Sequence, residues 1–288
     1  MPFISTIQPK QNKTTVTNRL PSPAIWNSCP WLDIIAGNRD GLIDGDDFVS
    51  ADNEDGSDNS YLRYIDTGNT IRILATNTTA LATGVRGGVL RLDLDASDND
   101  GPVIQRQTAN GAGQVLIGNT SGAAWKLFFE ARVRKSLITD NGVAFAVGLA
   151  QVGRAADDGL LDDNAGDIVD SISFIGFRNK HDNGEELDFV YQDGGQTAPT
   201  ETIANIAAMV ADTWVKVGFV YDPAEVAEKK IKIFLNNAEQ GTYVTTTNID
   251  AATFPENDVL SFVFGAKNGT AAVSTADIDW WRLCQLYD

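Results

Sequence analysis

The sequence predicts an all-β protein, an antiparallel two-sheet β-sandwich that follows an extended N-terminal arm. Three observations lead to this prediction. From Trp26 onward, apolar and polar residues alternate with a period of two, the spacing that places side chains on opposite faces of a strand. Clusters of Gly, Asn and Asp separate these segments at short intervals, as in sandwiches and barrels. Residues 1–22 show no such period.

The chain of 288 residues is expected to fold as one sandwich domain over residues 23–288. All-β sandwiches reach roughly 200 to 250 residues as single units. Residues 1–22 are rich in Lys, Asn, Thr and Pro, which favours an extended arm outside the core. Phe3, Ile4 and Ile7 form a small apolar group in this arm that suits docking elsewhere, and the alternative is a terminus without a role.

Ten segments alternate strongly enough to be expected as strands. In residues 127–135, apolar side chains share one face and Glu130, Arg132 and Arg134 share the other, which predicts one buried and one solvated face. Residues 143–150 are apolar on both faces, as in a strand covered on both sides. The remaining segments are 70–76, 88–94, 170–177, 187–192, 214–221, 230–235, 259–266 and 276–286. Residues 200–212 fit a short helix or a further strand.

The overall charge excludes some partners. The chain has 22 Lys and Arg against 39 Asp and Glu, a formal net charge of −17, so its surface should repel a phosphate backbone. Nucleic acid is therefore not an expected partner. No stretch approaches the roughly 18 apolar residues of a membrane span, and no charged-then-apolar secretion signal begins the sequence. We expect no membrane partner and no secretion.

Two cysteines, Cys29 and Cys284, are too few for a disulfide scaffold and lack the spacing of metal ligands. Buried free thiols are the favoured interpretation. The alternative is a cross-link that closes nearly the whole chain, if the first and last strands pair.

Two segments resemble parts of a known family. In residues 211–244, a Trp opens a strand, an acidic turn follows, and an apolar strand ends in a polar turn, as in a recurrent hairpin of laminin-G and concanavalin A-like domains. Residues 264–283, with Trp280 and Trp281, resemble the final strand of that family. With FFEARVR and AFAVGLA, the resemblance covers roughly residues 120–288. It implies the jelly-roll sandwich of the concanavalin A-like lectin/glucanase family.

An arm followed by such a sandwich also resembles virion proteins of tailed bacteriophages. This resemblance implies a non-enzymatic structural protein, a capsid decoration or cement protein or a tail-associated one, made in the host cytoplasm and located in the virion. Its arm would bind other virion proteins, and it would work as a homo-oligomer or in repeated copies. The alternatives are a lectin-like module that binds host glycans and, less favoured, a glycoside hydrolase.

The residues argue against hydrolysis. That reaction needs two carboxyl groups flanking one glycosidic bond, which the glucanase branch carries as Glu-x-Asp-x-(x)-Glu on one strand. Here Glu186 and Asp188 match, but Tyr191 occupies the place of the second glutamate, and a phenol with a pKa of about 10 is a poor proton donor. The single histidine, His181, lies in a polar turn and is expected to be solvated. No serine elbow accompanies it.

Calcium is the one metal that the sequence suggests. Residues 36–48 approach an EF-hand loop, although Ala36 occupies the first ligand position and no helical pattern flanks the loop. The bland alternative is an acidic turn. Acidic loops at 93–101 and 157–167 are further candidates without a motif. The candidate calcium ligands are Asn38, Asp40, Asp44 and Asp47.

A lectin needs aromatic platforms beside polar groups, because sugar rings stack by their apolar faces. Packing inside or at the edge of the sandwich is the favoured alternative for each aromatic residue that could serve. These residues are Trp26, Trp31, Tyr61, Tyr64, Tyr191 and Tyr221.

Overall fold

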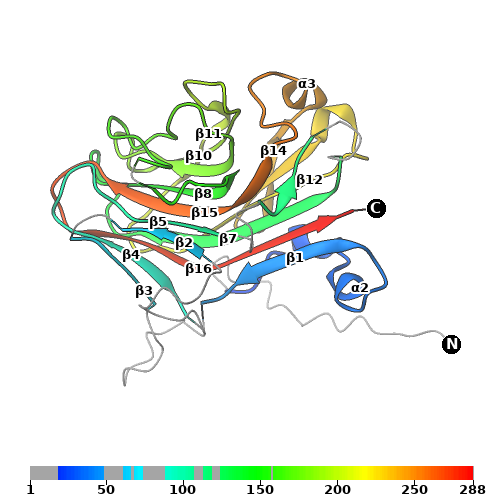
Figure 1. The fold of residues 1–288 in the computed structure, drawn as a ribbon, viewed down its shortest axis with the longest axis horizontal. Coiled ribbons are helices and arrows are strands. Elements are labelled where there is room, and N and C mark those ends of the chain that lie inside the picture. Colours follow the sequence, from blue (N-terminus) through cyan, green and yellow to red (C-terminus); the bar gives the residue numbers. More distant parts are fainter. Residues whose placement is uncertain are drawn as a thin grey trace.

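The computed structural model describes residues 19–48, 61–65, 68–73, 88–106, 113–118, 124–156 and 158–287. In these residues two antiparallel sheets stack face to face, and short helices lie at the periphery (Figure 1). The predicted all-β, two-sheet sandwich is confirmed. No helix in the described part of the chain is both long and apolar enough to cross a membrane.

Sheet A has the strand order β14-β13-β12-β7-β16-β4-β3. A further strand, β1, pairs with the C-terminal half of β16, and the two lie side by side in Figure 1. The bounds are β1 Gly41–Asp46, β3 Thr70–Ile73, β4 Leu90–Leu94, β7 Leu127–Lys135, β12 Val215–Tyr221, β13 Ile231–Leu235, β14 Ala238–Val244 and β16 Ser274–Leu286.

Sheet B has the order β11-β10-β9-β8-β15-β5-β2, and β6 pairs with β15. Its strands are β2 Tyr61–Tyr64, β5 Val103–Arg106, β6 Val115–Leu116, β8 Val143–Gln151, β9 Phe174–Asn179, β10 Glu186–Gln192, β11 Thr200–Ala208 and β15 Val259–Asn268. Residues 200–208 are thus a strand, the second of the two alternatives that the sequence left open. The helices are α1 Pro23–Trp26, α2 Trp31–Ile35, η1 Ala227–Lys229 and α3 Thr246–Ile249.

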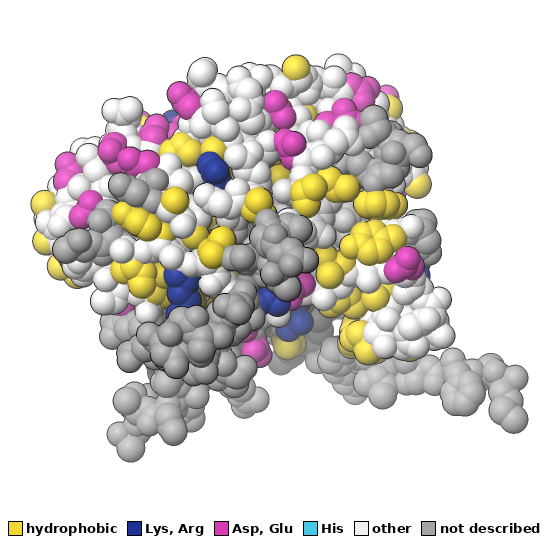
Figure 2. Space-filling model, in the orientation of Figure 1, with side chains coloured by type: hydrophobic (Ala, Val, Ile, Leu, Met, Phe, Trp, Pro, Cys, Tyr) yellow, Lys and Arg dark blue, Asp and Glu magenta, His cyan; other side chains and the backbone are white. Residues whose placement is uncertain are grey.

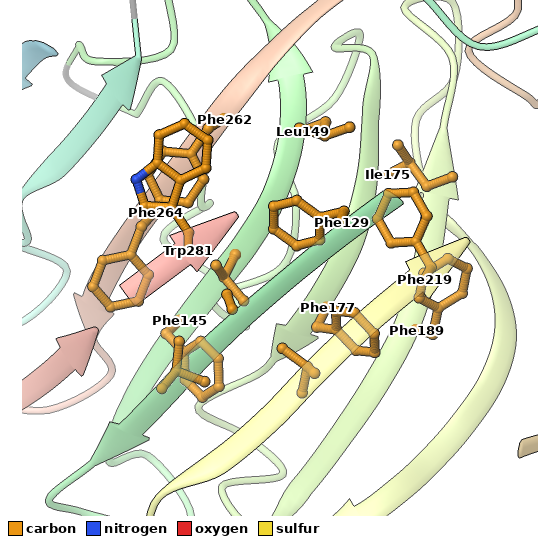
Figure 3. Close-up of a cluster of buried hydrophobic side chains, with 14 of the residues drawn as sticks. Phe129, Phe145, Leu149, Ile175, Phe177, Phe189, Phe219, Phe262, Phe264 and Trp281 are labelled. Atoms are coloured by element: carbon orange, nitrogen blue, oxygen red, sulfur yellow. The ribbon is translucent and has the colours of Figure 1, made fainter. Parts of the chain in front are cut away.

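Aromatic side chains fill the space between the sheets (Figure 3). The rings of Phe262 on β15 and Trp281 on β16 stack with centroids 4.1 Å apart and an interplanar angle of 4°. Phe129 and Phe219 pair within sheet A at 5.3 Å, and Phe219 reaches Phe189 of sheet B at 5.7 Å. These contacts join the two sheets, because large aromatic rings bury most area per residue.

The outer face of sheet B is covered by the connection between β8 and β9. Ala144, Ala146 and Ala150 point outward from β8, and Leu160 and Ile168 of the connection pack against them. Short side chains on the strand let the loop approach closely. The predicted coverage of both faces of residues 143–150 is confirmed.

The outer face of β7 differs from its prediction. Glu130 and Arg132 are 0% and 4% exposed, so this face is not solvated. The N-terminal segment, residues 19–40, begins on it: the backbone N–H of Ser22 donates to Glu130 at 2.9 Å, and Arg19 pairs with Asp279 at 2.7 Å. The alternation in residues 127–135 predicted a solvated outer face. It could not show that residues 19–40, which are distant in sequence, begin on this face and cover it.

The expected arm, residues 1–22, falls mostly outside the described residues, which begin at Arg19. The four described residues of the arm are tied to sheet A, where the ammonium of Lys216 donates to the Leu20 carbonyl at 3.1 Å. Ser22 is fully buried. The boundary at residue 22 stays a prediction.

Glu130 holds the N-terminal segment, and its removal tests this role. Its carboxylate accepts hydrogen bonds from the Ser22 N–H and from Trp26 Nε1 at 2.7 Å. We expect Glu130→Ala to lower the free energy of unfolding by about 2–4 kcal/mol, because both donors lose a buried acceptor. Urea unfolding measures the change, and limited proteolysis should cut within residues 19–40 faster. The exposed Glu228→Ala is the control, expected within about 0.5 kcal/mol. Equal losses in both variants would refute the role.

Candidate functional site

An open cleft of about 480 Å³ lies where the C-terminal end of β16 meets β6 and the start of β15. Its size falls within the range of small-ligand sites, roughly 300–1,000 Å³. We call it the end cleft. It is lined by Asp40, Gln114, Val115, Leu116, Trp125, Val259, Gln285 and Tyr287.

Two aromatic rings form one wall of the end cleft. Trp125 lies just before β7 and Tyr287 just after β16, and their rings meet edge to face with centroids 5.1 Å apart. Adjacent strand pairing fixes this geometry, because the Leu286 N–H donates to the Lys126 carbonyl at 2.9 Å. Neither residue was among the aromatic residues that the sequence suggested for a sugar site. The sequence does show that Trp125 and Tyr287 flank two predicted strands, 127–135 and 276–286.

Asp40 brings a carboxylate to the same wall. The Tyr287 N–H donates to the Asp40 carbonyl at 3.3 Å, which ties the two segments together. Burial and the neighbouring Asp40 carboxylate raise the pKa of Tyr287 above its usual value, so its hydroxyl keeps its proton at neutral pH. The wall thus offers an acceptor, a phenol and two ring faces.

The two amides of the end cleft are held by the protein itself. Gln285 binds both backbone groups of Leu116, accepting from its N–H at 3.2 Å and donating to its carbonyl. The Gln114 oxygen accepts from the Phe262 N–H at 3.1 Å, and its amide nitrogen donates to Asp44. These contacts fix β6 against β15 and β16, and they make the floor of the cleft rigid.

The predicted calcium ligands are separated by a strand. Asn38 and Asp40 precede β1 and Asp47 follows it, all three exposed, whereas Asp44 lies within β1 and pairs with Arg106 at 2.9 Å. Because residues 41–46 are extended at about 3.3 Å per residue, they hold the residues before the strand apart from Asp47 after it. Among the described residues, no group of three or more Asp, Glu, His or Cys side chains could hold a metal ion. Calcium binding by Asn38, Asp40, Asp44 and Asp47 stays a prediction.

The acidic loops use their carboxylates internally. Lys267 on β15 pairs with both Asp158 and Asp163 of the 157–167 loop. Asp95, in the 93–101 loop, accepts from the Ser97 N–H at 2.8 Å. These loops are therefore held by their own ion pairs and turns.

The glucanase-like strand carries its groups on opposite faces. Asp188 is 4% exposed and accepts from the Asn205 N–H at 2.8 Å, with Arg178 beside it. Glu186 shares this outer face. Tyr191 points into the core, where its ring meets Phe254 at 5.1 Å. A sugar on the outer face could meet Glu186, but Asp188 is buried beside Arg178 and the Tyr191 phenol lies in the core.

His181 differs from the expected solvated loop residue. It is 4% exposed, and neither ring nitrogen has a hydrogen-bond partner. Gly166 and Gly269 come so close that a side chain at either would overlap the imidazole. Its backbone joins two further loops, since its N–H donates to Ala165 and its carbonyl accepts from the Asn141 N–H. Close packing of loops that are distant in sequence explains the error.

Lys135 is a second buried base. Its ammonium donates to the Val143 carbonyl at 2.8 Å and to the Asn179 side chain. Burial lowers the pKa of Lys135 to about 7. At 1% exposure the amine lies away from any opening, so its role is to join β7 to sheet B.

Most of the proposed aromatic platforms pack inside the protein. Trp26 stacks on Phe128, the hydroxyl of Tyr221 donates to the Gly118 carbonyl at 2.6 Å, and Tyr61 bonds to Trp281 Nε1 at 2.9 Å. Tyr191 is in the core, and Tyr64 is half-buried. Trp31 is 45% exposed on α2.

Figure 2 shows acidic side chains scattered over one face of the molecule rather than gathered at one place.

No protein-family model matches the chain, and no curated protein matches its sequence. Solved structures do match. Peanut lectin with a nine-residue peptide is 12% identical, with a TM-score of 0.52 over 85% of this chain and 97% of that one. The potassium-bound carbohydrate recognition domain of Emp46p is 12% identical, with a TM-score of 0.51 over 83% and 94%.

A third similar structure, a protein of unknown function from Shewanella oneidensis MR-1, is 14% identical, with a TM-score of 0.52 over 89% of this chain and 94% of that one. Identities this low show the fold alone, since one fold hosts many functions. The chain has the fold of the concanavalin A-like lectins, as its closing segments indicated.

His181 should make stability depend on pH. Burial lowers the pKa of His181 below its usual 6.5, so on acidification the unfolded chain binds a proton before the native protein does. We expect the contribution of His181 to the free energy of unfolding to fall as pH drops through about 6.5 and to level off below the native pKa. In His181→Leu this component should vanish.

The chain has one histidine, and Lys135 and the carboxyl groups are common to both proteins. The difference between their urea unfolding curves from pH 8 to 4.5, roughly the range of histidine titration, therefore isolates the contribution of His181. Parallel stability curves for the two proteins would contradict the prediction.

Proposed function

We propose that the chain is a non-enzymatic, lectin-like carbohydrate-binding module whose binding site is the end cleft. The observation that carries the proposal is the wall in which Trp125 and Tyr287 stand beside the Asp40 carboxylate on a lectin fold. A sugar ring has apolar C–H faces, which stack on aromatic rings, and hydroxyls, which donate to a carboxylate. This wall supplies both kinds of contact within one cleft.

The arrangement favours binding over hydrolysis. Among the described residues lining the end cleft, only Asp40 carries a carboxyl group. Glycoside hydrolysis uses two, one as proton donor and one as nucleophile or base. The other candidate pair is no better, since Asp188 is paired with Arg178 and Tyr191 points into the core.

The setting of this module stays a prediction of the sequence. We propose a phage-like virion, in which the part of the 1–22 arm that precedes Arg19 binds other capsid or tail proteins and repeated copies display the end cleft. Repeated copies would raise the avidity of a weak sugar site without new contacts. Purified particles that lack the protein would refute this setting, while leaving the binding site to be judged by the next experiment.

The binding site is tested by a glycan array followed by titration calorimetry of the best ligand, with and without calcium. We expect Trp125→Ala to weaken binding at least about tenfold, because it removes the stacking surface. Asp40→Asn keeps the shape but loses the charged acceptor, and should weaken binding by about three- to tenfold.

The matched control is Trp31→Ala, which removes an exposed tryptophan that does not line the end cleft. It should leave affinity unchanged. An array on which the wild-type chain binds no glycan in either condition, or a Trp125→Ala variant with full affinity, would refute the proposal.

A further inference from the structure

Two cysteines from opposite ends of the sequence meet beneath the N-terminal segment. Cys29 lies in the loop between α1 and α2, and Cys284 lies near the end of β16. Both residues are buried, at 6% and 0% exposure, in one apolar cluster that includes Ile25 and Phe128. The two thiols lie close enough for each to shift the pKa of the other, and both are free. The fold therefore brings together two groups that the sequence separates by almost its whole length.

The segment that carries Cys29 needs external support. Its helices α1 and α2 have four and five residues, too few for a helix to be stable by itself. It is held instead by polar contacts, including Ser22 and Trp26 with Glu130, and the Ala24 N–H with Asn237 at 3.0 Å. A covalent bond at Cys29 would add to these polar contacts and to the apolar cluster around Ile25, which hold the segment without any covalent link.

We propose that Cys29 and Cys284 are a disulfide-forming pair that links the N-terminal segment to β16, the last strand of the chain. The oxidant is a low-molecular-weight disulfide such as oxidised glutathione. The Cys29 thiolate attacks it, forms a mixed disulfide and releases one glutathione thiolate. Cys284 then loses its proton and attacks the Cys29 sulfur, which releases the second. The two cysteines lose two electrons and two protons, and two glutathione thiols are formed.

The order of attack follows from the surroundings of the two thiols. Contact with Cys284 lowers the pKa of the Cys29 thiol, whereas contact with Cys29 and burial raise the pKa of Cys284. The group with the lower pKa supplies more thiolate, and thiolate is the nucleophile in exchange. Cys29 also lies next to Asn27 and Ser28, which are exposed, so the reagent can approach from that side.

The bond would also secure the wall of the end cleft. The segment that carries Cys29 continues to Asp40, and the strand that carries Cys284 continues to Gln285 and Tyr287. A disulfide would hold these two chain segments together where they already share the hydrogen bond from Tyr287 to Asp40. The pairing of the cysteines does not depend on sugar binding, and its test measures thiols.

The test uses the full chain, oxidised with glutathione disulfide, then denatured in an excess of alkylating reagent and weighed by mass spectrometry. We expect a loss of the mass of two hydrogen atoms, no alkylation, and a Cys29–Cys284 cross-linked peptide after digestion without reductant. The thermal midpoint should rise by about 10 °C, because the bond closes a loop of nearly the whole chain, and dithiothreitol should reverse the rise.

Cys29→Ser and Cys284→Ser are matched controls, in which oxidation should give no internal cross-link and no rise in thermal midpoint. Two alkylated thiols in the oxidised wild-type chain, stable glutathione adducts on both cysteines, or disulfide-linked dimers of two chains would each overturn the proposal. If neither serine variant folds, the peptide map of the wild-type chain decides.

Discussion

The last strand of the chain occupies the middle of sheet A, and most other features of the molecule depend on its pairing. β16 hydrogen-bonds to β7 on one side and to β4 and β1 on the other. The strand before it in the chain, β15, crosses to the other sheet and is central in sheet B between β8 and β5. Each sheet is therefore assembled around one of the last two strands, and neither sheet is complete until residues 259–286 have joined. Pairing of this kind has a high contact order, which makes folding slow.

A single irregularity in β16 sets which side chains face each direction. Ile278 points into the core, and a register shift between Ile278 and Trp280 reverses the alternation, so that Trp281 also points inward. Trp281 then stacks on Phe262 between the sheets. On the outer face, Asp277 and Asp279 follow each other at the start of this region and bind arginines from neighbouring strands and from the N-terminal segment.

The regular strands could be predicted from sequence because their own side chains specify them. The bounds of residues 127–135 and 143–150 were predicted almost to the residue, since the apolar side chains that face the core recur at every second position. β1 was read as an acidic loop. Its sequence GLIDGD has glycines and aspartates that are poor in strands, and only pairing with β16 makes it one. The sequence also did not predict β2, β5 and β6, which are too short to show an alternation. It did not predict β14, whose side chains are mostly exposed.

The end cleft could not be predicted, because the residues that line it lie at or near the ends of several strands and form no sequence motif. Trp125 and Tyr287 are unremarkable in sequence, and their contact exists only because β7 and β16 pair in one register. The sequence drew attention to Asp40 for a different reason, as a calcium ligand. The buried state of His181 and of the outer face of β7 was hidden likewise, since the covering residues come from distant parts of the chain.

The charge of the molecule bears on what the end cleft can bind. Several basic side chains are engaged inside the fold, Lys267 with Asp158 and Asp163, and Arg178 with Asp167. The net charge of −17 therefore lies largely on a surface with more carboxylates than ammonium groups, and Asp40 adds a negative charge within the cleft. An anionic sugar would be repelled both on approach and at the site. For the carbohydrate-binding function proposed above, neutral or amine-bearing glycans are consequently the class expected to bind.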